Sequence, residues 1–175
     1  EPRVAGFNPC AEQALEHREA CNLAELFPGM FNGDNAAIAR SLWLITRYAL
    51  RQRIGVFQDP IAEEVAKRNM RIGVALGGIC DFSTDGNMPS WMYDTVRVTA
   101  DDYADDLNVN RPVTVTTIKP SGTISLMNES RPGMHENPAA SEFYLRRNEH
   151  QLSEPTAKAL IAAGVPYVHI PEKKG

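Results

Sequence analysis

Three polar side chains with complementary chemistry lie at alternate positions near the start of the chain. They are Asn8, Cys10 and Glu12, in the segment Asn-Pro-Cys-Ala-Glu. Pro9 biases the preceding residue toward an extended backbone, in which side chains alternate, so we expect these three to point the same way. A thiol, a carboxylate and an amide on one face can perform redox or radical chemistry with proton transfer. The alternative is that Cys10 is a small buried residue and Glu12 is solvated.

The setting of Cys10 does not suit a cysteine hydrolase. A neighbouring carboxylate raises the pKa of a thiol and opposes the thiolate, and no histidine base is adjacent in the sequence. A neutral thiol beside a carboxylate is still acceptable as a donor of a hydrogen atom. The carboxylate of Glu12 is then free to act as a base.

A second cysteine, Cys21, lies eleven positions after Cys10 and begins the segment Cys-Asn-Leu. A zinc site would need a Cys-x-x-Cys pair or a matching histidine pair, and the sequence has neither, so no metal-ligating residues are predicted. Two thiols within reach of one another favour two-electron redox work, and the alternative is a packed core cysteine. Cys80 follows two glycines on an apolar run, and we assign it no role. Three cysteines are too few for a disulfide scaffold, which favours a reducing, cytoplasmic compartment.

Residues 119–123, Lys-Pro-Ser-Gly-Thr, form a candidate anion-binding loop. Ser121, Gly122 and Thr123 offer successive backbone N–H groups and two hydroxyls, and Gly122 lets the backbone approach an anion closely. The spacing matches neither the P-loop nor the dinucleotide fingerprint. An ordinary turn rich in serine and glycine is the alternative.

The composition is that of one globular domain. The 175 residues are 43% apolar and 23% charged, and 18 basic against 22 acidic residues leave a net charge of -4. A general nucleic-acid binder would carry a basic excess, so that class is disfavoured. No run approaches the length of a transmembrane helix and no leader peptide is visible, so we expect no membrane association.

Helical and strand-like patterns alternate along the chain, which predicts an α/β sheet or barrel. Asp34 or Asn35 can cap the first helix, and we expect its buried face to consist of Ile38, Leu42, Ile45 and Ala49, which follow at helical spacing. Asp59-Pro60 is the predicted start of the second helix. The predicted helices cover residues 35–49, 60–69, 90–107 (capped by Ser90) and 155–163. The predicted strands cover residues 71–82, with a glycine-rich exit, 112–118, 143–147 and 165–170, and a short apolar run covers residues 124–127.

The ordered set of motifs resembles ribonucleotide reductase. The set comprises Asn-Pro-Cys-x-Glu, Cys-Asn-Leu, Lys-Pro-Ser-Gly-Thr-x-Ser-Leu, Pro-Gly-x-His and Tyr-x-Arg-Arg, between Asn8 and Arg147. It is most similar to the monomeric, adenosylcobalamin-dependent type that reduces ribonucleoside triphosphates. A dimeric cobalamin-dependent diphosphate reductase and a non-catalytic nucleotide-binding module remain alternatives. The chain departs from the family at Ala11, where the family often has glycine.

This resemblance implies a ten-stranded α/β barrel with a central finger loop. Residues 1–175 would form the C-terminal portion of that catalytic barrel, with the finger loop at about 6–28 and the phosphate-binding loop at 119–123. A piece of a barrel leaves open strand edges, so we expect this chain alone to be inactive and poorly folded.

The resemblance also implies a role for each candidate residue. Cys10 would carry a thiyl radical that takes hydrogen from the ribose 3′ carbon. Glu12 would accept the proton of the 3′ hydroxyl, and Asn8 would hydrogen-bond the sugar hydroxyls. Cys21 would be one of two thiols that reduce the 2′ position and end as a disulfide. The remaining candidates, which would cradle the substrate phosphates, are Ser121, Gly122 and Thr123.

The implied partners follow from the same resemblance. The cofactor would be adenosylcobalamin, whose cobalt and organic ring carry the difficult bond homolysis. The substrate would be a ribonucleoside triphosphate, and a thioredoxin-like protein would regenerate the thiols. A nucleotide effector would act through regions outside this chain, and the whole enzyme would be a monomer.

Overall fold

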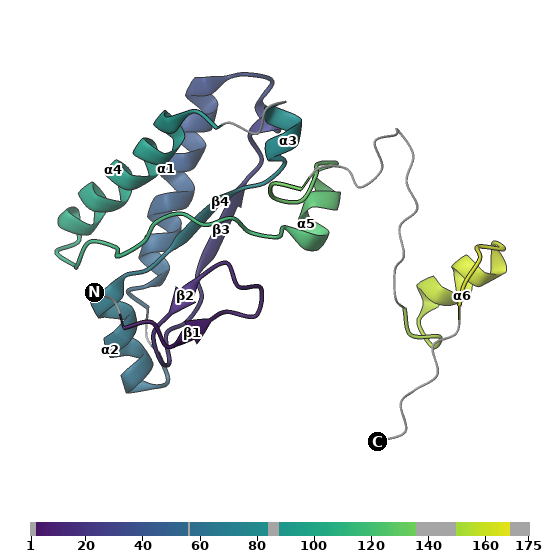
Figure 1. The fold of residues 1–175 in the computed structure, drawn as a ribbon, viewed down its shortest axis with the longest axis horizontal. Helices are drawn as coiled ribbons and strands as arrows, with labels where there is room; N and C mark the ends of the chain where they lie inside the picture. Colours follow the sequence, from purple (N-terminus) through teal and green to yellow (C-terminus); the bar gives the residue numbers. More distant parts are fainter. Residues whose placement is uncertain (1–2, 56, 84–87, 136–149, 169–175) are drawn as a thin grey trace. The chain divides into compact units, whose positions relative to one another are not determined.

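A computed structural model describes residues 3–55, 57–83, 88–135 and 150–168. The chain divides into two compact units, Glu1–Pro138 and Ala139–Gly175. In order along the chain (Figure 1), the described elements are β1 (Gly6–Phe7), β2 (Ala14–Leu15), β3 (Leu23–Leu26), the 3-10 helix η1 (Pro28–Phe31), α1 (Asn35–Gln52), α2 (Pro60–Asn69), β4 (Gly73–Leu76), α3 (Ile79–Phe82), α4 (Ser90–Asp106), α5 (Gly122–Met127) and α6 (Pro155–Ala162). None of the helices in these ranges is long and apolar enough to span a membrane.

Local sequence signals determine where the first two long helices begin. The carboxylate of Asp34 accepts the backbone N–H of Ala37 over 3.0 Å, which confirms the predicted cap of α1. Asp59 accepts the N–H of Ile61 over 2.9 Å at the start of α2, and Pro60 occupies the first turn.

The predicted capping role of Ser90 is wrong. The cap position of α4 is Pro89, with an extended backbone, and no side chain caps this helix. The carbonyl oxygen of Pro89 already accepts the N–H of Met92 over 3.0 Å. Ser90 is therefore inside the first turn, where its hydroxyl is no longer placed to cap the helix.

Two parallel strands form the central sheet of the first unit. β3 pairs with β4 in a register that runs from Leu23 opposite Gly73 to Leu26 opposite Leu76. On the other side of β4, the predicted strand at 112–118 continues the parallel arrangement, although Val74 and Thr116 form its single regular bridge. Helices connect parallel neighbours, so the structure is a mixed α/β fold, as predicted.

The predicted strand at 71–82 is too long. The strand ends at Leu76, and Gly78 adopts a left-handed backbone with φ of 62° that turns the chain into α3. The apolar run at 124–127 belongs to α5.

The predicted C-terminal helix is confirmed as α6, but no strand follows it within residues 165–168. The predicted strand at 143–147, and the last two residues of the predicted strand at 165–170, lie outside the described residues.

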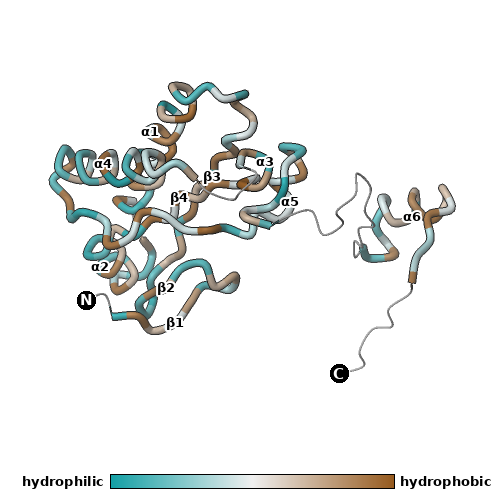
Figure 2. Tube along the Cα trace, turned by 45° about the horizontal axis from the view of Figure 1, so that its top comes forward, coloured by the Kyte–Doolittle hydropathy of each residue, from teal (hydrophilic) through white to brown (hydrophobic). Residues whose placement is uncertain are grey.

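The core of the first unit lies between α1, α4 and the parallel strands. Figure 1 shows α1 and α4 side by side, on one side of the strands, and hydrophobic positions recur along both helices in Figure 2. The predicted inner face of α1 is confirmed, because Ile38, Leu42 and Ala49 are fully buried and Ile45 packs against them. This packing leaves the opposite side of the strands to the β1–β2 hairpin and α5.

Candidate functional site

The first motif forms the tip of a hairpin. β1 and β2 pair antiparallel, with Gly6 opposite Leu15, and the backbone N–H of Asn8 donates to the carbonyl of Gln13 over 3.1 Å. Within the tip, the N–H of Ala11 donates to the carbonyl of Asn8 over 2.9 Å. The motif is thus folded into a tight turn.

The expected alternation of side chains within this motif is therefore wrong. Alternation requires an extended backbone, whereas the turn reverses the chain between Asn8 and Ala11 and gives Ala11 a left-handed φ of 60°. That conformation favours glycine, which is the residue that the resemblance to ribonucleotide reductase implies at this position.

Asn8 connects the hairpin tip to the second motif. Its side chain is buried, and its Oδ1 accepts the backbone N–H of Gln13 over 2.9 Å. Its Nδ2 donates to the sulfur of Cys21 over 3.4 Å. Both ends of the amide are therefore committed, which fixes its orientation and brings the two motifs together.

The thiol of Cys21 lies among the other candidate groups. Partial burial raises the pKa of this thiol, and the carboxylate of Glu12 raises it further. The hydrogen bond from Asn8 lowers the pKa, Cys10 raises it, and the positive charge of Arg53 lowers it. Cys10 and Cys21 are both free thiols in exposed positions.

Glu12 carries a polar atom that the described part of the protein leaves unsatisfied. Its Oε2 is buried and has no hydrogen-bond partner among the described residues. A buried carboxylate oxygen of this kind can accept a hydrogen bond from a ligand. The backbone carbonyl of Glu12 accepts the hydroxyl of Thr117, so the hairpin tip is bonded to the segment that leads to the loop at 119–123.

The candidate phosphate loop is held by a residue whose role the sequence did not reveal. Glu25, on β3, is nearly fully buried and accepts hydrogen bonds from the hydroxyl of Ser121 and, over 3.0 Å, from Nζ of Lys119. The Ser121 oxygen in turn accepts the backbone N–H of Gly133 over 2.9 Å. Gly122 opens α5 with a left-handed φ of 50°. The Ser121 hydroxyl is therefore engaged inside the protein.

The structure thus brings four of the predicted residues together around the Cys21 thiol. Asn8 is hydrogen-bonded to its sulfur, and the charges of Glu12 and Cys10 both raise its pKa. The described hydrogen bonds of the Ser121 hydroxyl reach Glu25, Lys119 and Gly133 and none of these four residues. Gly122 and Thr123, the remaining predicted phosphate-binding residues, lie exposed in the first turn of α5. A charged residue within an otherwise apolar strand, such as Glu25, is a sequence signal for a buried polar contact. Its partners could not be read from the sequence, because they lie nearly a hundred residues away.

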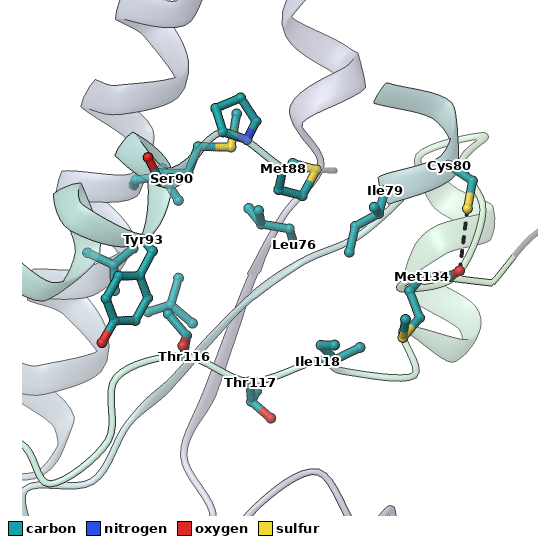
Figure 3. Close-up of a pocket in the computed structure, with 15 residues that line it drawn as sticks. Leu76, Ile79, Cys80, Met88, Ser90, Tyr93, Thr116, Thr117, Ile118 and Met134 are labelled. Carbon is teal, nitrogen blue, oxygen red and sulfur yellow. Dashed lines mark hydrogen bonds between the residues drawn. The ribbon is translucent and has the colours of Figure 1, made fainter. Parts of the chain in front are cut away.

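A cavity of about 390 Å³ lies elsewhere in the first unit (Figure 3). It is lined mainly by apolar side chains from β4, α3, α4 and residues 116–118, including Leu76, Ile79 and Tyr93. The thiol of Cys80 lines it and donates to the carbonyl of Met134 over 3.4 Å. The lining residues include none of the predicted site residues, although Thr117 lines the cavity and also donates its hydroxyl to the backbone carbonyl of Glu12.

No group of three histidine, cysteine, aspartate or glutamate side chains within the described ranges could hold a metal ion. The Tyr-x-Arg-Arg motif at 144–147 lies outside those ranges.

Comparison with known proteins gives the family context. No protein-family model matches the chain. A protein of Dictyostelium discoideum named "Probable adenosylcobalamin-dependent ribonucleoside-triphosphate reductase" is 33% identical over 168 residues, which cover 93% of this chain and 22% of that protein. The adenosylcobalamin-dependent ribonucleoside-triphosphate reductase of Euglena gracilis is 32% identical over 170 residues, or 94% of this chain and 23% of the relative. The enzyme of the same name from Lactobacillus leichmannii is 29% identical over 92% of this chain and 26% of its own length.

A solved structure supports the same assignment. The crystal structure of a B12-dependent, class II ribonucleotide reductase superposes with a TM-score of 0.70 and 29% identity, over 75% of this chain and 23% of that one. The chain is therefore homologous to a segment of the class II ribonucleotide reductases. The curated relatives within that class are the adenosylcobalamin-dependent ribonucleoside-triphosphate reductases, which confirms the resemblance found in the motifs. The chain spans about a quarter of their length.

Proposed function

We propose that this chain forms part of the catalytic barrel of an adenosylcobalamin-dependent reductase that converts ribonucleoside triphosphates to 2′-deoxyribonucleoside triphosphates. Residues 1–175 would be the C-terminal portion of a ten-stranded barrel, with a finger loop at about 6–28. The parallel neighbours of β4 and the hairpin beside them support this arrangement. The names of the relatives support the choice of triphosphate over diphosphate substrates.

Cys10 is the proposed radical residue. Its thiol is exposed at the hairpin tip, so a bulky organocobalt group has access to it. Adenosylcobalamin, when bound, supplies the homolytic bond cleavage that generates the radical. We assign none of the described residues to hold the corrin ring. The Cys10 thiyl radical removes the hydrogen atom from the ribose 3′ carbon, and the thiol is re-formed in that step.

Glu12 and Asn8 would act on the sugar hydroxyls. The Oε2 of Glu12, which has no hydrogen-bond partner in the described part of the chain, would accept the proton of the 3′ hydroxyl. The amide of Asn8 is held at both ends, and the arriving sugar would compete with the Cys21 sulfur for its Nδ2–H. These groups would hold the ribose against the sulfur of Cys10, whose thiyl radical abstracts the hydrogen atom.

Cys21 would supply reducing equivalents. Two thiols, of which Cys21 is one, give two electrons and two protons, so that the 2′ hydroxyl leaves as water, a C–H bond replaces it and a disulfide forms. The second thiol would lie outside this chain, and a thioredoxin-like dithiol protein would reduce the disulfide. The substrate phosphates would bind at residues Ser121, Gly122 and Thr123, near Lys119, and an effector nucleotide would act through other regions of the enzyme.

The contact between Asn8 and Cys21 carries this proposal, since it joins the two thiol motifs in one site. The test is deoxynucleotide formation by the full-length protein with adenosylcobalamin, a dithiol reductant and each ribonucleoside triphosphate. Cys10→Ser should abolish turnover, whereas the matched variant Cys80→Ser, outside the site, should retain it. Turnover retained by Cys10→Ser would overturn the radical assignment, and turnover with diphosphates alone would overturn the substrate class.

A further inference from the structure

Two hydrogen bonds attach the backbone around Cys21 to the C-terminal end of α1. On one side of the thiol, Nη1 of Arg53 donates to the carbonyl of Ala20 over 3.0 Å. On the other side, Nδ2 of Asn22 donates to the carbonyl of Ala49 over 2.8 Å. Cys21 is thus held between two side-chain contacts, although it lies just before β3 and is itself exposed.

The side chain of Arg53 is almost completely buried, but only one of its nitrogen atoms has a hydrogen-bond partner among the described residues. The residue is 2% exposed, and its Nε and Nη2 have no hydrogen-bond partner among the described residues. Burial of a guanidinium without full hydrogen bonding is costly, because its unpaired N–H groups lose their contact with water and gain no partner. Arg53 occupies the cap position at the end of α1, where a positive charge complements the helix dipole.

The buried charges near Arg53 do not balance. Glu19 pairs with Arg71, its Oε1 lying 3.1 Å from Nε of Arg71, and its Oε2 accepts the N–H of Glu16 over 2.8 Å. Both side chains of this ion pair are almost completely buried. Two buried cations, Arg53 and Arg71, therefore face one fully buried carboxylate, and Arg53 forms no ion pair of its own among the described residues.

We propose that Arg53 is a positioning residue for Cys21, which holds the backbone before the thiol and stabilises its thiolate form. The other charged or titratable groups that act on this thiol are Glu12 and Cys10, and both raise its pKa, as burial does. Arg53 is the charged group that lowers it. The guanidinium thus offsets part of the penalty that burial and Glu12 impose on the thiolate.

This inference deepens the proposed function, on which its role in turnover rests. When a dithiol reductant opens the disulfide that contains Cys21, the incoming thiolate attacks the other sulfur and a new S–S bond forms there. The old S–S bond breaks, and Cys21 leaves with its electron pair as a thiolate. A nearby positive charge favours that leaving group, so Arg53 would speed the reduction of the disulfide.

The test measures the reactivity of Cys21 without requiring turnover. The reduced full-length protein is alkylated with iodoacetamide over a range of pH, and mass spectrometry of the Cys21 peptide gives the rate at each pH. Arg53→Gln keeps a hydrogen-bond donor and removes the charge, so it should move the profile to higher pH and slow alkylation at pH 7 about threefold to tenfold. Arg53→Lys, which keeps the charge, should stay near the wild-type profile.

Two matched variants separate charge from mechanical support. Arg51→Gln removes an exposed arginine two positions earlier on α1 and should leave the Cys21 profile unchanged. Asn22→Ala removes the other side-chain contact without changing charge and should move the profile less than Arg53→Gln does. Circular dichroism establishes that each variant is folded.

A wild-type profile in folded Arg53→Gln would overturn the proposal. An equal shift in Asn22→Ala would also overturn it, because the effect would then be purely mechanical. If Arg53→Gln does not fold, Arg53→Lys decides the matter: a profile within twofold of wild type supports the charge role and a larger shift overturns it. Failure of the proposed function itself would appear separately, as turnover retained by Cys10→Ser.

Discussion

The side-chain amide of Asn8 donates a hydrogen bond to the sulfur of Cys21 over 3.4 Å, and the two residues are 13 positions apart. The same amide accepts the backbone N–H of Gln13, so one side chain both closes the hairpin tip and meets the second thiol. Neither contact follows the residue spacing of a helix or a strand, so neither can be predicted from sequence periodicity. Together they turn two separate sequence motifs into one site.

Asn8→Ala should affect both stability and the Cys21 thiol. The buried N–H of Gln13 would lose its acceptor, which costs about 1–3 kcal/mol of unfolding free energy. The pKa of Cys21 should rise, because the hydrogen bond from Asn8 lowers it. Urea denaturation and the pH profile of Cys21 alkylation measure the two effects. Asn128→Ala, which removes an exposed amide bonded to the carbonyl of Ile124, is the control and should change neither.

Ala11→Gly should stabilise the hairpin tip or leave its stability unchanged. Ala11 adopts a left-handed backbone with φ of 60°, which costs an L-residue roughly 1–2 kcal/mol and glycine almost nothing. The greater freedom of glycine in the unfolded chain offsets about 0.4–1 kcal/mol of this gain. In Ala36→Gly, on the exposed face of α1, the same exchange should cost about 0.5–1 kcal/mol. Denaturation curves that show Ala11→Gly to be the more destabilising variant would contradict the backbone conformation found here.

Gly73→Ala should disturb the contact between the hairpin and the sheet. A β-carbon at Gly73 would lie 2.5 Å from Nε2 of Gln13, 2.8 Å from Cδ2 of Leu23 and 2.9 Å from Cγ2 of Thr117. Overpacking of this kind lowers the free energy of unfolding by about 1–3 kcal/mol, and it would displace the hairpin that carries the Cys10 thiol. Gly6→Ala, where an added β-carbon meets nothing within 4 Å, should be tolerated. Equal stability and turnover in the two variants would refute this packing.

Glu19→Gln should be among the most destabilising polar substitutions in the chain. Glu19 and Arg71 form an ion pair whose side chains are 0% and 3% exposed, so the loss of one charge leaves the other uncompensated. Breaking a buried pair costs about 3–5 kcal/mol. Arg18→Ala at the exposed pair with Asp59 should cost about 0–1 kcal/mol. Thermal unfolding of the two variants provides the comparison.

Some of this architecture could be predicted because its signals are local. The caps Asp34 and Asp59 determine where α1 and α2 begin, and the spacing of Ile38, Leu42 and Ala49 gave the buried face of α1. These features depend on neighbours within one or two turns of a helix.

The remainder depends on contacts between distant segments. The hairpin strands are two residues each, too short for any periodic pattern, so the sequence predicts an extended segment where the structure has the turn at Asn8. Glu25 could not be assigned a role, because its partners Lys119 and Ser121 approach only when the loop folds against β3. Cys10, Glu12 and Cys21 belong to recognisable motifs, whereas the burial of Arg53 near Cys21 depends on how the end of α1 packs against the segment before β3.

The most direct test of the central claim is a single turnover of the reduced full-length protein with adenosylcobalamin and a ribonucleoside triphosphate, without external reductant. Deoxynucleotide and the oxidation state of each cysteine are then quantified by mass spectrometry. We predict one disulfide containing Cys21 for each deoxynucleotide formed, with Cys10 recovered as a free thiol. Deoxynucleotide formed while Cys21 remains a free thiol would contradict the account.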